Sequence, residues 1–168
     1  MKIPVRGSAP IALAMAALFA AVPARAQDSG IQIGARAPAV SVETLDGKMV
    51  DLGQFIGKSP VLIEFWATWC PVCKELDPAM KAAHAKYGSR VKFIGVSVNV
   101  NQTIPRVKAF VAKYGIPGDQ YWDGKGEATD KYEVPATSYV VVIDKNGKIV
   151  YTGVGAKQDL DAAIRKAL

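Results

Sequence analysis

The sequence predicts an α/β protein in which helices cover a central mixed sheet. Residues 61–65, 91–98 and 138–143 are short runs of apolar, β-branched and aromatic side chains, a pattern typical of buried strands. Helical periodicity follows the first two runs, so these strands need crossover connections and are expected to be parallel. The Asn146-Gly147 pair is a strong hairpin signal and adds an antiparallel strand at residues 149–152.

The first 26 of the 168 residues resemble a secretory signal peptide. Lys2 and Arg6 precede an apolar run at residues 11–22, and Ala24-Arg25-Ala26 forms a small-residue cleavage site before Gln27. The apolar run is shorter than the ~20 residues that a transmembrane helix needs. We expect cleavage and export to a bacterial periplasm or a similar oxidising space, with an uncleaved N-terminal anchor as the alternative.

Removal of this segment leaves about one domain's worth of chain. The formal net charge falls from +6 to +3, because the segment holds three cations and no acids. No run of Lys and Arg is interleaved with aromatic residues, so nucleic-acid binding is not expected. Residues 27–34 are predicted to be a flexible lead, and residues 35–168 to be the folded domain.

The chain begins its folded part with a predicted β-hairpin. Residues 39–44 alternate as a half-buried strand does, residues 46–48 carry a turn signal, and residues 49–52 can return as a second strand. Residues 52–56 are expected to form a helical turn before the strand at residues 61–65.

The longest predicted helix spans residues 71–87. Its apolar face follows helical spacing, and Pro78 inside it is expected to cause a kink because proline removes one backbone hydrogen bond. The residues of that face are Leu76, Met80, Ala83 and Tyr87.

The second half of the chain continues the alternation. A helix is predicted to begin at Ile104 and to end at Gly115, which suits the position just past a helix. Residues 116–124 are expected to return to the sheet or to form a loop, residues 127–132 to form a short helix, and residues 160–168 to form the last helix.

The two cysteines of the chain, Cys70 and Cys73, lie where the predicted strand turns into the helix. Pro71 suits the first helical position. A helix N-terminus stabilises a thiolate, so the pKa of Cys70 should fall below its ordinary value of ~8.5. We expect Cys70 to be the nucleophile and Cys73 to be the more buried, resolving thiol of a redox pair.

Two other interpretations of the pair are weaker. A static disulfide that closes so short a loop removes little entropy from the unfolded chain. A zinc site would need more ligands, yet there is no second cysteine pair, and His84 is the one histidine. His84 is interpreted as a surface or packing residue.

Residues 66–73, with Pro78 five positions after the second cysteine, resemble the thioredoxin superfamily. More narrowly, the chain is similar to the TlpA/ResA-like periplasmic thiol-disulfide oxidoreductases, over residues 34–168. The resemblance implies a thioredoxin-like three-layer α/β/α sandwich with a mixed central sheet and an added N-terminal β-hairpin.

The resemblance also assigns roles to side chains near the cysteines. Glu64 matches the buried carboxylate of thioredoxin, and its role would be to take the proton of Cys73. The alternative is that Glu64 faces solvent at the end of a strand. Glu75 lies one position before the glutamate that ResA-like proteins often carry, so it is interpreted as a surface charge.

A second motif, Val134-Pro135, precedes the strand at residues 138–143. The resemblance implies a cis peptide bond at Pro135, beside the cysteine pair, and backbone hydrogen bonds from Val134 to an extended client. Trp66, Trp69 and Pro135 would frame an apolar surface around Cys70. The residues expected to bind substrate are Trp66, Trp69, Pro71, Val72 and Val134.

The resulting expectation is a periplasmic reductase, without a cofactor, that acts as a monomer. The resemblance implies clients such as apocytochrome c or the cysteines of a copper site, and a membrane thiol transporter as electron donor. Two alternatives remain open. One is an oxidase that donates its disulfide, and the other is a copper chaperone that uses both cysteines and a third ligand from His84 or a methionine.

Overall fold

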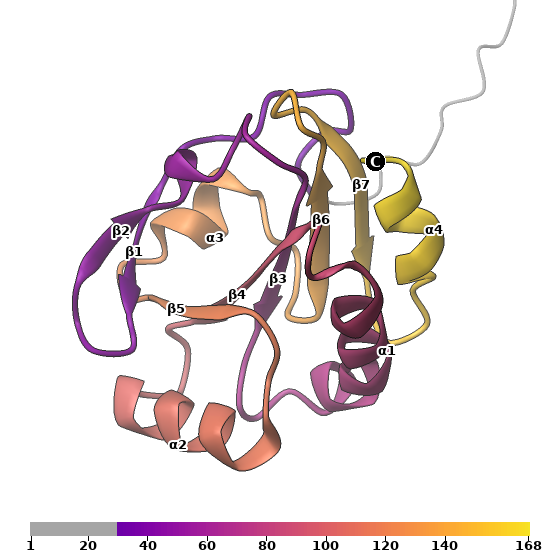
Figure 1. Ribbon diagram of the computed structural model, residues 1–168. Coiled ribbons are helices and arrows are strands. Elements are labelled where there is room, and N and C mark those ends of the chain that lie inside the picture. Colours follow the sequence, from indigo (N-terminus) through magenta and orange to yellow (C-terminus); the bar gives the residue numbers. More distant parts are fainter. Residues whose placement is uncertain (1–29) are drawn as a thin grey trace, which may run out of the picture.

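The computed structural model describes residues 30–168, which form a seven-stranded mixed sheet with helices on both faces (Figure 1). The predicted signal peptide at residues 1–26 lies outside the described residues. The strands are β1 (Ser41–Thr44), β2 (Met49–Asp51), β3 (Val61–Trp66), β4 (Lys92–Val98), β5 (Asp119–Asp123), β6 (Tyr139–Ile143) and β7 (Ile149–Val154). The helices are α1 (Pro71–Tyr87), α2 (Ile104–Tyr114), α3 (Glu127–Lys131) and α4 (Leu160–Arg165), with a 3₁₀ turn η1 (Leu52–Gln54).

The strands follow the order β2-β1-β5-β4-β3-β6-β7 across the sheet. Strand β4 is parallel to both β3 and β5, while β6 pairs antiparallel with β3 and with β7. The N-terminal hairpin of β1 and β2 joins the sheet through an antiparallel pairing of β1 with β5. The predicted mixed sheet and the added hairpin are therefore confirmed.

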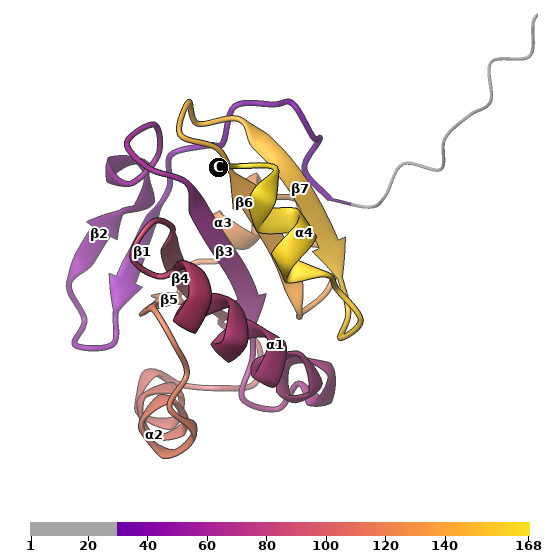
Figure 2. The same ribbon diagram turned by 45° about the vertical axis from the view of Figure 1, so that its right-hand side comes forward.

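The helices form layers on the two faces of the sheet. Helices α1 and α4 pack side by side on one face, and α3 covers the other face near β1 and β5 (Figures 1 and 2). On the first face, Leu62 of β3 belongs to the same buried cluster as Leu76 and Leu160. On the second, the ring of Phe65 lies 5.4 Å from that of Tyr132. Side chains along β3 point alternately to the two faces of the sheet, so only those on one face contact α1.

Helix α1 begins and ends as predicted and continues through Pro78. Its expected apolar face is buried, and full burial of one such side chain contributes about 1.5–3 kcal/mol to stability. Helix α2 also ends where expected, just before Gly115, whose φ of 60° is left-handed. Helix α4 ends three residues earlier than predicted, and Leu168 beyond it is about half exposed.

The start of the described chain is packed on the domain, although residues 27–34 were expected to be flexible. The buried Ile31 donates its N–H to the hydroxyl of Tyr139 at 3.1 Å, and Gly34 donates to the carbonyl of Ile149 at 2.8 Å. For residues 30–34 the expectation was wrong, because their backbone groups and one apolar side chain find partners on β6 and β7.

Candidate active site

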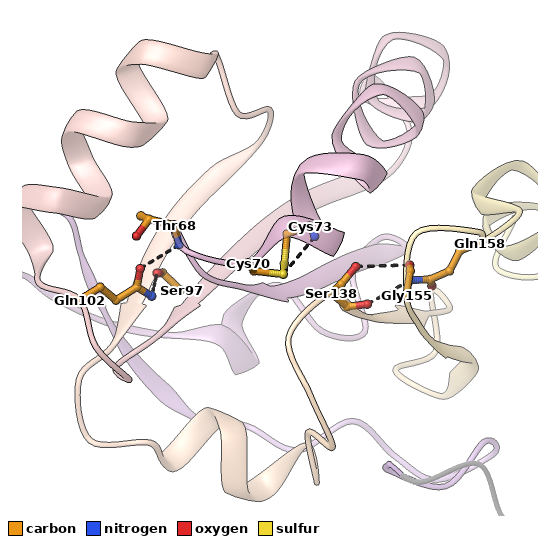
Figure 3. The surroundings of a disulfide bond; sticks show 8 residues. All are labelled: Thr68, Cys70, Cys73, Ser97, Gln102, Ser138, Gly155 and Gln158. Atoms are coloured by element: carbon orange, nitrogen blue, oxygen red, sulfur yellow. Dashed lines mark hydrogen bonds between the residues drawn. A yellow bond between two sulfur atoms is a disulfide. The ribbon is translucent and has the colours of Figure 1, made fainter.

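The cysteine pair lies at the turn from β3 into α1, as predicted. Cys70 caps the helix: its backbone is extended and its sulfur accepts the N–H of Cys73 at 3.0 Å (Figure 3). Pro71 occupies the first turn, where its missing N–H leaves no bond unmade. The free N–H groups and the positive end of the helix dipole therefore point at the Cys70 sulfur.

Cys70 and Cys73 form a disulfide, with 5.4 Å between their Cα atoms. Both residues are buried, but Cys70 is 2% exposed and Cys73 is 8% exposed. The expectation that Cys73 is the more covered residue is therefore wrong in this oxidised state. Cys73 lines a cavity, which accounts for its greater exposure.

The exposed surface beside the disulfide is built from Trp69, Pro71 and Val72. Trp69 is 40% exposed and Val72 is 36% exposed, and the indole N–H of Trp69 donates to the carbonyl of Val100 at 2.7 Å. Val100 is itself more than half exposed. The apolar surface thus extends from the start of α1 to the loop that follows β4.

Trp66 does not contribute to this surface, so that expectation was wrong. As the last residue of β3, it points to the α1 face together with Leu62 and Glu64, because strand side chains alternate. Its ring lies 5.6 Å from that of Phe110, and its indole N–H donates to Gln120 at 3.1 Å. Trp66 is therefore buried beneath the site.

The loop before β6 reaches the site through Ser138, whose N–H donates to the carbonyl of Phe65 at 2.8 Å. No peptide bond within residues 30–168 is cis, so the expected cis bond at Pro135 was wrong. The loop turns instead through left-handed backbone at Glu133 and Ser138, with φ values of 49° and 65°. The trans form is the more stable one for most X–Pro bonds.

The two residues of this motif differ in what they can offer a client. Pro135 is exposed and Val134 is half-buried. The N–H of Val134 donates to the carbonyl of Thr129 at 3.0 Å, so it is not available to a client. The carbonyl oxygen remains the backbone group that Val134 can present, so of the expected backbone hydrogen bonds to a client, Val134 can contribute only as an acceptor.

Glu64 is buried in the middle of β3 rather than exposed at its end. It is 9% exposed, and it lines a cavity of about 230 Å³ together with Cys73. Burial raises the pKa of Glu64 to about 8, and the charge of Asp77 acts in the same direction. The other lining residues are Trp66, Ala67, Lys74, Asp77, Phe110, Tyr114 and Ile116.

Gln102 is a residue that the sequence did not single out. Its side-chain oxygen accepts the N–H of Thr68 at 2.9 Å, and its amide donates to the hydroxyl of Ser97 (Figure 3). The same amide also donates to the carbonyl of Val98. It therefore joins the end of β4 to the turn that carries Cys70. A lone glutamine in a loop carries no sequence signal for this role.

Gln158 plays a similar part on the other side of the disulfide (Figure 3). Its side-chain amide donates to the carbonyls of Ser138 and Gly155, at 3.1 and 2.7 Å. The hydroxyl of Ser138 also donates to the carbonyl of Gly155 at 3.3 Å. The loop that carries Val134 and Pro135 is thus fixed at its β6 end.

His84 and Glu75 lie outside the site. His84 packs edge-on against Phe93, with 5.0 Å between ring centroids, and Glu75 is exposed on α1. Both agree with their interpretation as packing and surface residues. Within residues 30–168, no three His, Cys, Asp or Glu side chains are grouped so as to hold a metal ion. None of the helices described there is long and apolar enough to cross a bilayer.

Known proteins are similar to this chain in sequence. The Redoxin family model matches residues 32–168. The thiol-disulfide oxidoreductase ResA of Bacillus thuringiensis subsp. konkukian (strain 97-27) is 31% identical over 142 residues, which cover 83% of this chain and 81% of the relative. The thioredoxin-like protein YneN of Bacillus subtilis (strain 168) is 30% identical over 138 residues, which cover 80% of each chain.

Two solved structures support the same assignment. A thiol:disulfide interchange protein of the thioredoxin family from Chlorobium tepidum TLS matches with a TM-score of 0.67 and 27% identity, covering 82% of this chain and 98% of that one. The structure of MTB DsbF matches with a TM-score of 0.65 and 27% identity, covering 76% and 92%. Given its strand-to-helix cysteine pair, this chain belongs to the Redoxin family and is a ResA-like thiol-disulfide oxidoreductase of the thioredoxin superfamily.

Proposed function

We propose that this oxidoreductase acts in the periplasm as a reductase of specific client proteins. The observation that carries the proposal is the arrangement of three groups. The Cys70 sulfur lies at the helix N-terminus, Cys73 is bonded to it from the first turn, and the carboxyl of Glu64 shares a cavity with Cys73. This arrangement supports the proposed roles of Cys70 as nucleophile, Cys73 as resolving thiol and Glu64 as proton acceptor.

In the reduced protein, the Cys70 thiolate attacks one sulfur of the client disulfide, and the other client sulfur leaves as a thiolate. Cys73 then gives its proton to Glu64 and attacks the Cys70 sulfur, which releases the remaining client sulfur as a thiolate. Two electrons pass to the client, and the Cys70–Cys73 disulfide forms.

Glu64 suits this exchange because its pKa of about 8 lies near that of an ordinary thiol. When a donor dithiol later attacks the disulfide at Cys70, the sulfur of Cys73 leaves as a thiolate and takes back the proton from Glu64. The same carboxyl therefore serves as base in one half of the cycle and as acid in the other.

The surface of Trp69, Pro71, Val72 and Pro135 is the proposed client contact. Each of these residues is apolar and exposed. The first three belong to the Cys70 turn and the start of α1, and Pro135 belongs to the loop that Ser138 joins to Phe65 at the end of β3. Clients with exposed cysteine pairs, such as apocytochrome c or the cysteines of a copper site, fit this chemistry. A membrane thiol transporter is the proposed electron donor, because an oxidising compartment supplies few electrons of its own.

Export rests on the N-terminal residues 1–26. We propose that cleavage after Ala26 releases the domain, and N-terminal sequencing of protein from a periplasmic fraction tests this. A mature chain that begins near Gln27 supports export, whereas an intact N-terminus in the membrane fraction indicates the anchored form.

The copper-chaperone alternative is weakened by geometry at its proposed third ligand. His84 lies 14 residues after Cys70 along α1, and a helical rise of 1.5 Å per residue separates them by about 20 Å. Met80 is about 15 Å away by the same reasoning. Neither side chain can complete a site with the two sulfurs while α1 stays intact.

Substitution of the resolving thiol tests the proposed order of attack. We expect Cys73→Ser to accumulate mixed disulfides between Cys70 and client proteins in a periplasmic extract, because the intermediate has no internal route to release. Non-reducing gels and mass spectrometry would detect these adducts. Cys70→Ser is the matched control and should give none. Adducts on Cys73 in that variant, or no adducts in either, would contradict the assignment of the nucleophile.

A further inference from the structure

A second acidic side chain, Asp77, lines the cavity that contains Glu64 and Cys73. Asp77 follows Cys73 by four residues on α1, so the two side chains lie on the same face of the helix, one turn apart. The cavity therefore holds two carboxyl groups and one of the redox sulfurs. The cycle proposed above uses only one of those carboxyls.

Asp77 is held by Lys81, one further turn along α1. The ammonium of Lys81 lies 2.7 Å from the Asp77 carboxylate and also donates to the carbonyl of Tyr114 at 2.7 Å. Tyr114 is the last residue of α2 and also lines the cavity. Lys81 thus ties the acid of α1 to the end of α2 and holds the Asp77 charge at the edge of the cavity.

We propose that Asp77 and Lys81 are positioning residues that control the proton exchange between Glu64 and Cys73. The anionic Asp77 disfavours a second negative charge in the cavity and so keeps Glu64 protonated. Lys81 partly offsets this repulsion. The inference rests on the proposed role of Glu64. It adds that the charges of Asp77 and Lys81 determine the pH range in which Glu64 can act as a base.

The other groups around Glu64 leave Asp77 as the acid that acts on it. On the neighbouring strands, the residues paired with Glu64 are Gly95 and Val140, which carry no charge. From α1 the titratable and charged lining groups are Cys73, Lys74 and Asp77, and from α2 the lining group is Tyr114. Lys74 extends toward Phe110, with its ammonium 5.8 Å from the ring centroid.

The pKa of Glu64 is consistent with the position of Asp77 in the cavity. Burial is the main cause of the raised pKa of Glu64, and the Asp77 charge adds to it. Loss of the Asp77 charge should let Glu64 ionise at lower pH, whereas loss of the Lys81 charge should delay its ionisation. The two substitutions should therefore shift the pKa of Glu64 in opposite directions. A merely structural role of Asp77 and Lys81 would not produce such opposite shifts.

The first test is a carbon-13 NMR titration of the Glu64 carboxyl in the oxidised protein. We expect Asp77→Asn to lower its midpoint by roughly half a unit or more and Lys81→Met to raise it. Glu75→Gln is the matched control, because it removes one negative charge from the exposed side of the same helix and should leave the midpoint unchanged. Equal shifts in the same direction for Asp77→Asn and Lys81→Met, or none, would overturn the inference.

The second test follows the Cys73 step with the aromatic disulfide 5,5′-dithiobis(2-nitrobenzoate). Attack by Cys70 releases one thiolate, and attack by Cys73 on the mixed disulfide releases the second. We expect Asp77→Asn to move the pH profile of the second release to lower pH and to speed that release at pH 7 by roughly twofold.

Glu64→Gln separates the two hypotheses in this assay. If Glu64→Gln leaves the profile of the second release unchanged, the proposed role of Glu64 fails. If Glu64→Gln changes the profile but Asp77→Asn does not, the role of Glu64 stands and the inference about Asp77 fails.

Discussion

The carboxyl of Glu64 lies in a strand whose other side chains are all apolar, and every residue of that strand is buried. The folded protein holds the Glu64 proton up to a pH of about 8, whereas an unfolded glutamate loses it near 4.3. Between these values the folded state binds more protons than the unfolded state, so Glu64 makes stability fall as pH rises. The fall ends once pH exceeds the folded pKa. A proton acceptor at this position therefore has a cost in stability at neutral pH.

Substitution of Glu64 by glutamine should remove this pH dependence. Between pH 5 and pH 8, we expect the free energy of unfolding of the oxidised wild-type protein to fall by about 3 kcal/mol more than that of Glu64→Gln. Only the wild type has a carboxyl at this position that is protonated in the folded state and ionised in the unfolded state. Urea denaturation at several pH values measures the difference. Parallel stability curves for the two proteins would mean that Glu64 titrates in the ordinary range.

At the scale of elements, the turn between β3 and α1 is held from outside by Gln102. The N–H of Thr68 is part of that turn and depends on the Gln102 side chain as its acceptor. Thr68 is itself buried, and a buried N–H without a partner costs about 1–3 kcal/mol. The loop after β4 thus contributes to the position of Cys70 without touching the disulfide.

We expect Gln102→Ala to destabilise the protein by about 1–3 kcal/mol and to speed hydrogen exchange at the Thr68 amide, since both follow from the lost acceptor. Gln54→Ala is the matched control, because the Gln54 amide makes an exposed bond to the carbonyl of Asp51. Urea denaturation and amide exchange provide the two readouts. Equal effects of the two substitutions would mean that the hydrogen bond from Thr68 to Gln102 contributes nothing to stability.

The segment before β1 is a second element that depends on close packing. Gly30 has a φ of +134°, and a Cβ placed on it would lie 2.4 Å from the hydroxyl of Tyr139. Tyr139 begins β6 and accepts the N–H of Ile31 through that hydroxyl. An added methyl group at this position would push the segment away from the sheet.

Gly30→Ala should therefore destabilise the protein by at least about 1 kcal/mol more than Gly34→Ala. Gly34 also has a positive φ, but a Cβ there meets nothing within 4 Å, so it controls for backbone strain alone. Thermal unfolding of both variants makes the comparison. A smaller effect at Gly30 than at Gly34 would show that residues 30–34 do not depend on this contact.

At the scale of the whole molecule, the sequence predicted the strands and helices that follow clear periodicity. Residues 71–87 carried a four-residue apolar face and a proline at the start, and they form α1 as expected. The partner order in the sheet was not predictable, because β5 begins with the polar residues Asp119 and Gln120 and gives a weak strand signal. That strand joins the N-terminal hairpin to the rest of the sheet.

The site was predicted in part for similar reasons. The spacing of the two cysteines is typical of a redox pair. Their place at the start of α1 could be predicted from the apolar strand before them and from Pro71. The depth of Glu64 could not, because periodicity does not separate the two faces of a strand that is covered on both sides. Trp66 and Trp69 look alike in sequence, yet Trp66 ends β3 and is buried against Phe110 of α2, whereas Trp69 lies exposed in the turn beyond the strand.

The reduction potential of the Cys70–Cys73 pair decides whether this protein reduces its clients or donates a disulfide to them. The hydrogen bond from the Cys73 N–H stabilises a Cys70 thiolate, which favours the reduced form and raises the potential. A reductase requires that the disulfide remain the more stable form despite this bond. Equilibration with glutathione or dithiothreitol buffers gives the value. We expect a potential near or below about −230 mV, as a reductase requires. A value near about −120 mV would contradict this expectation and identify the protein as a disulfide donor.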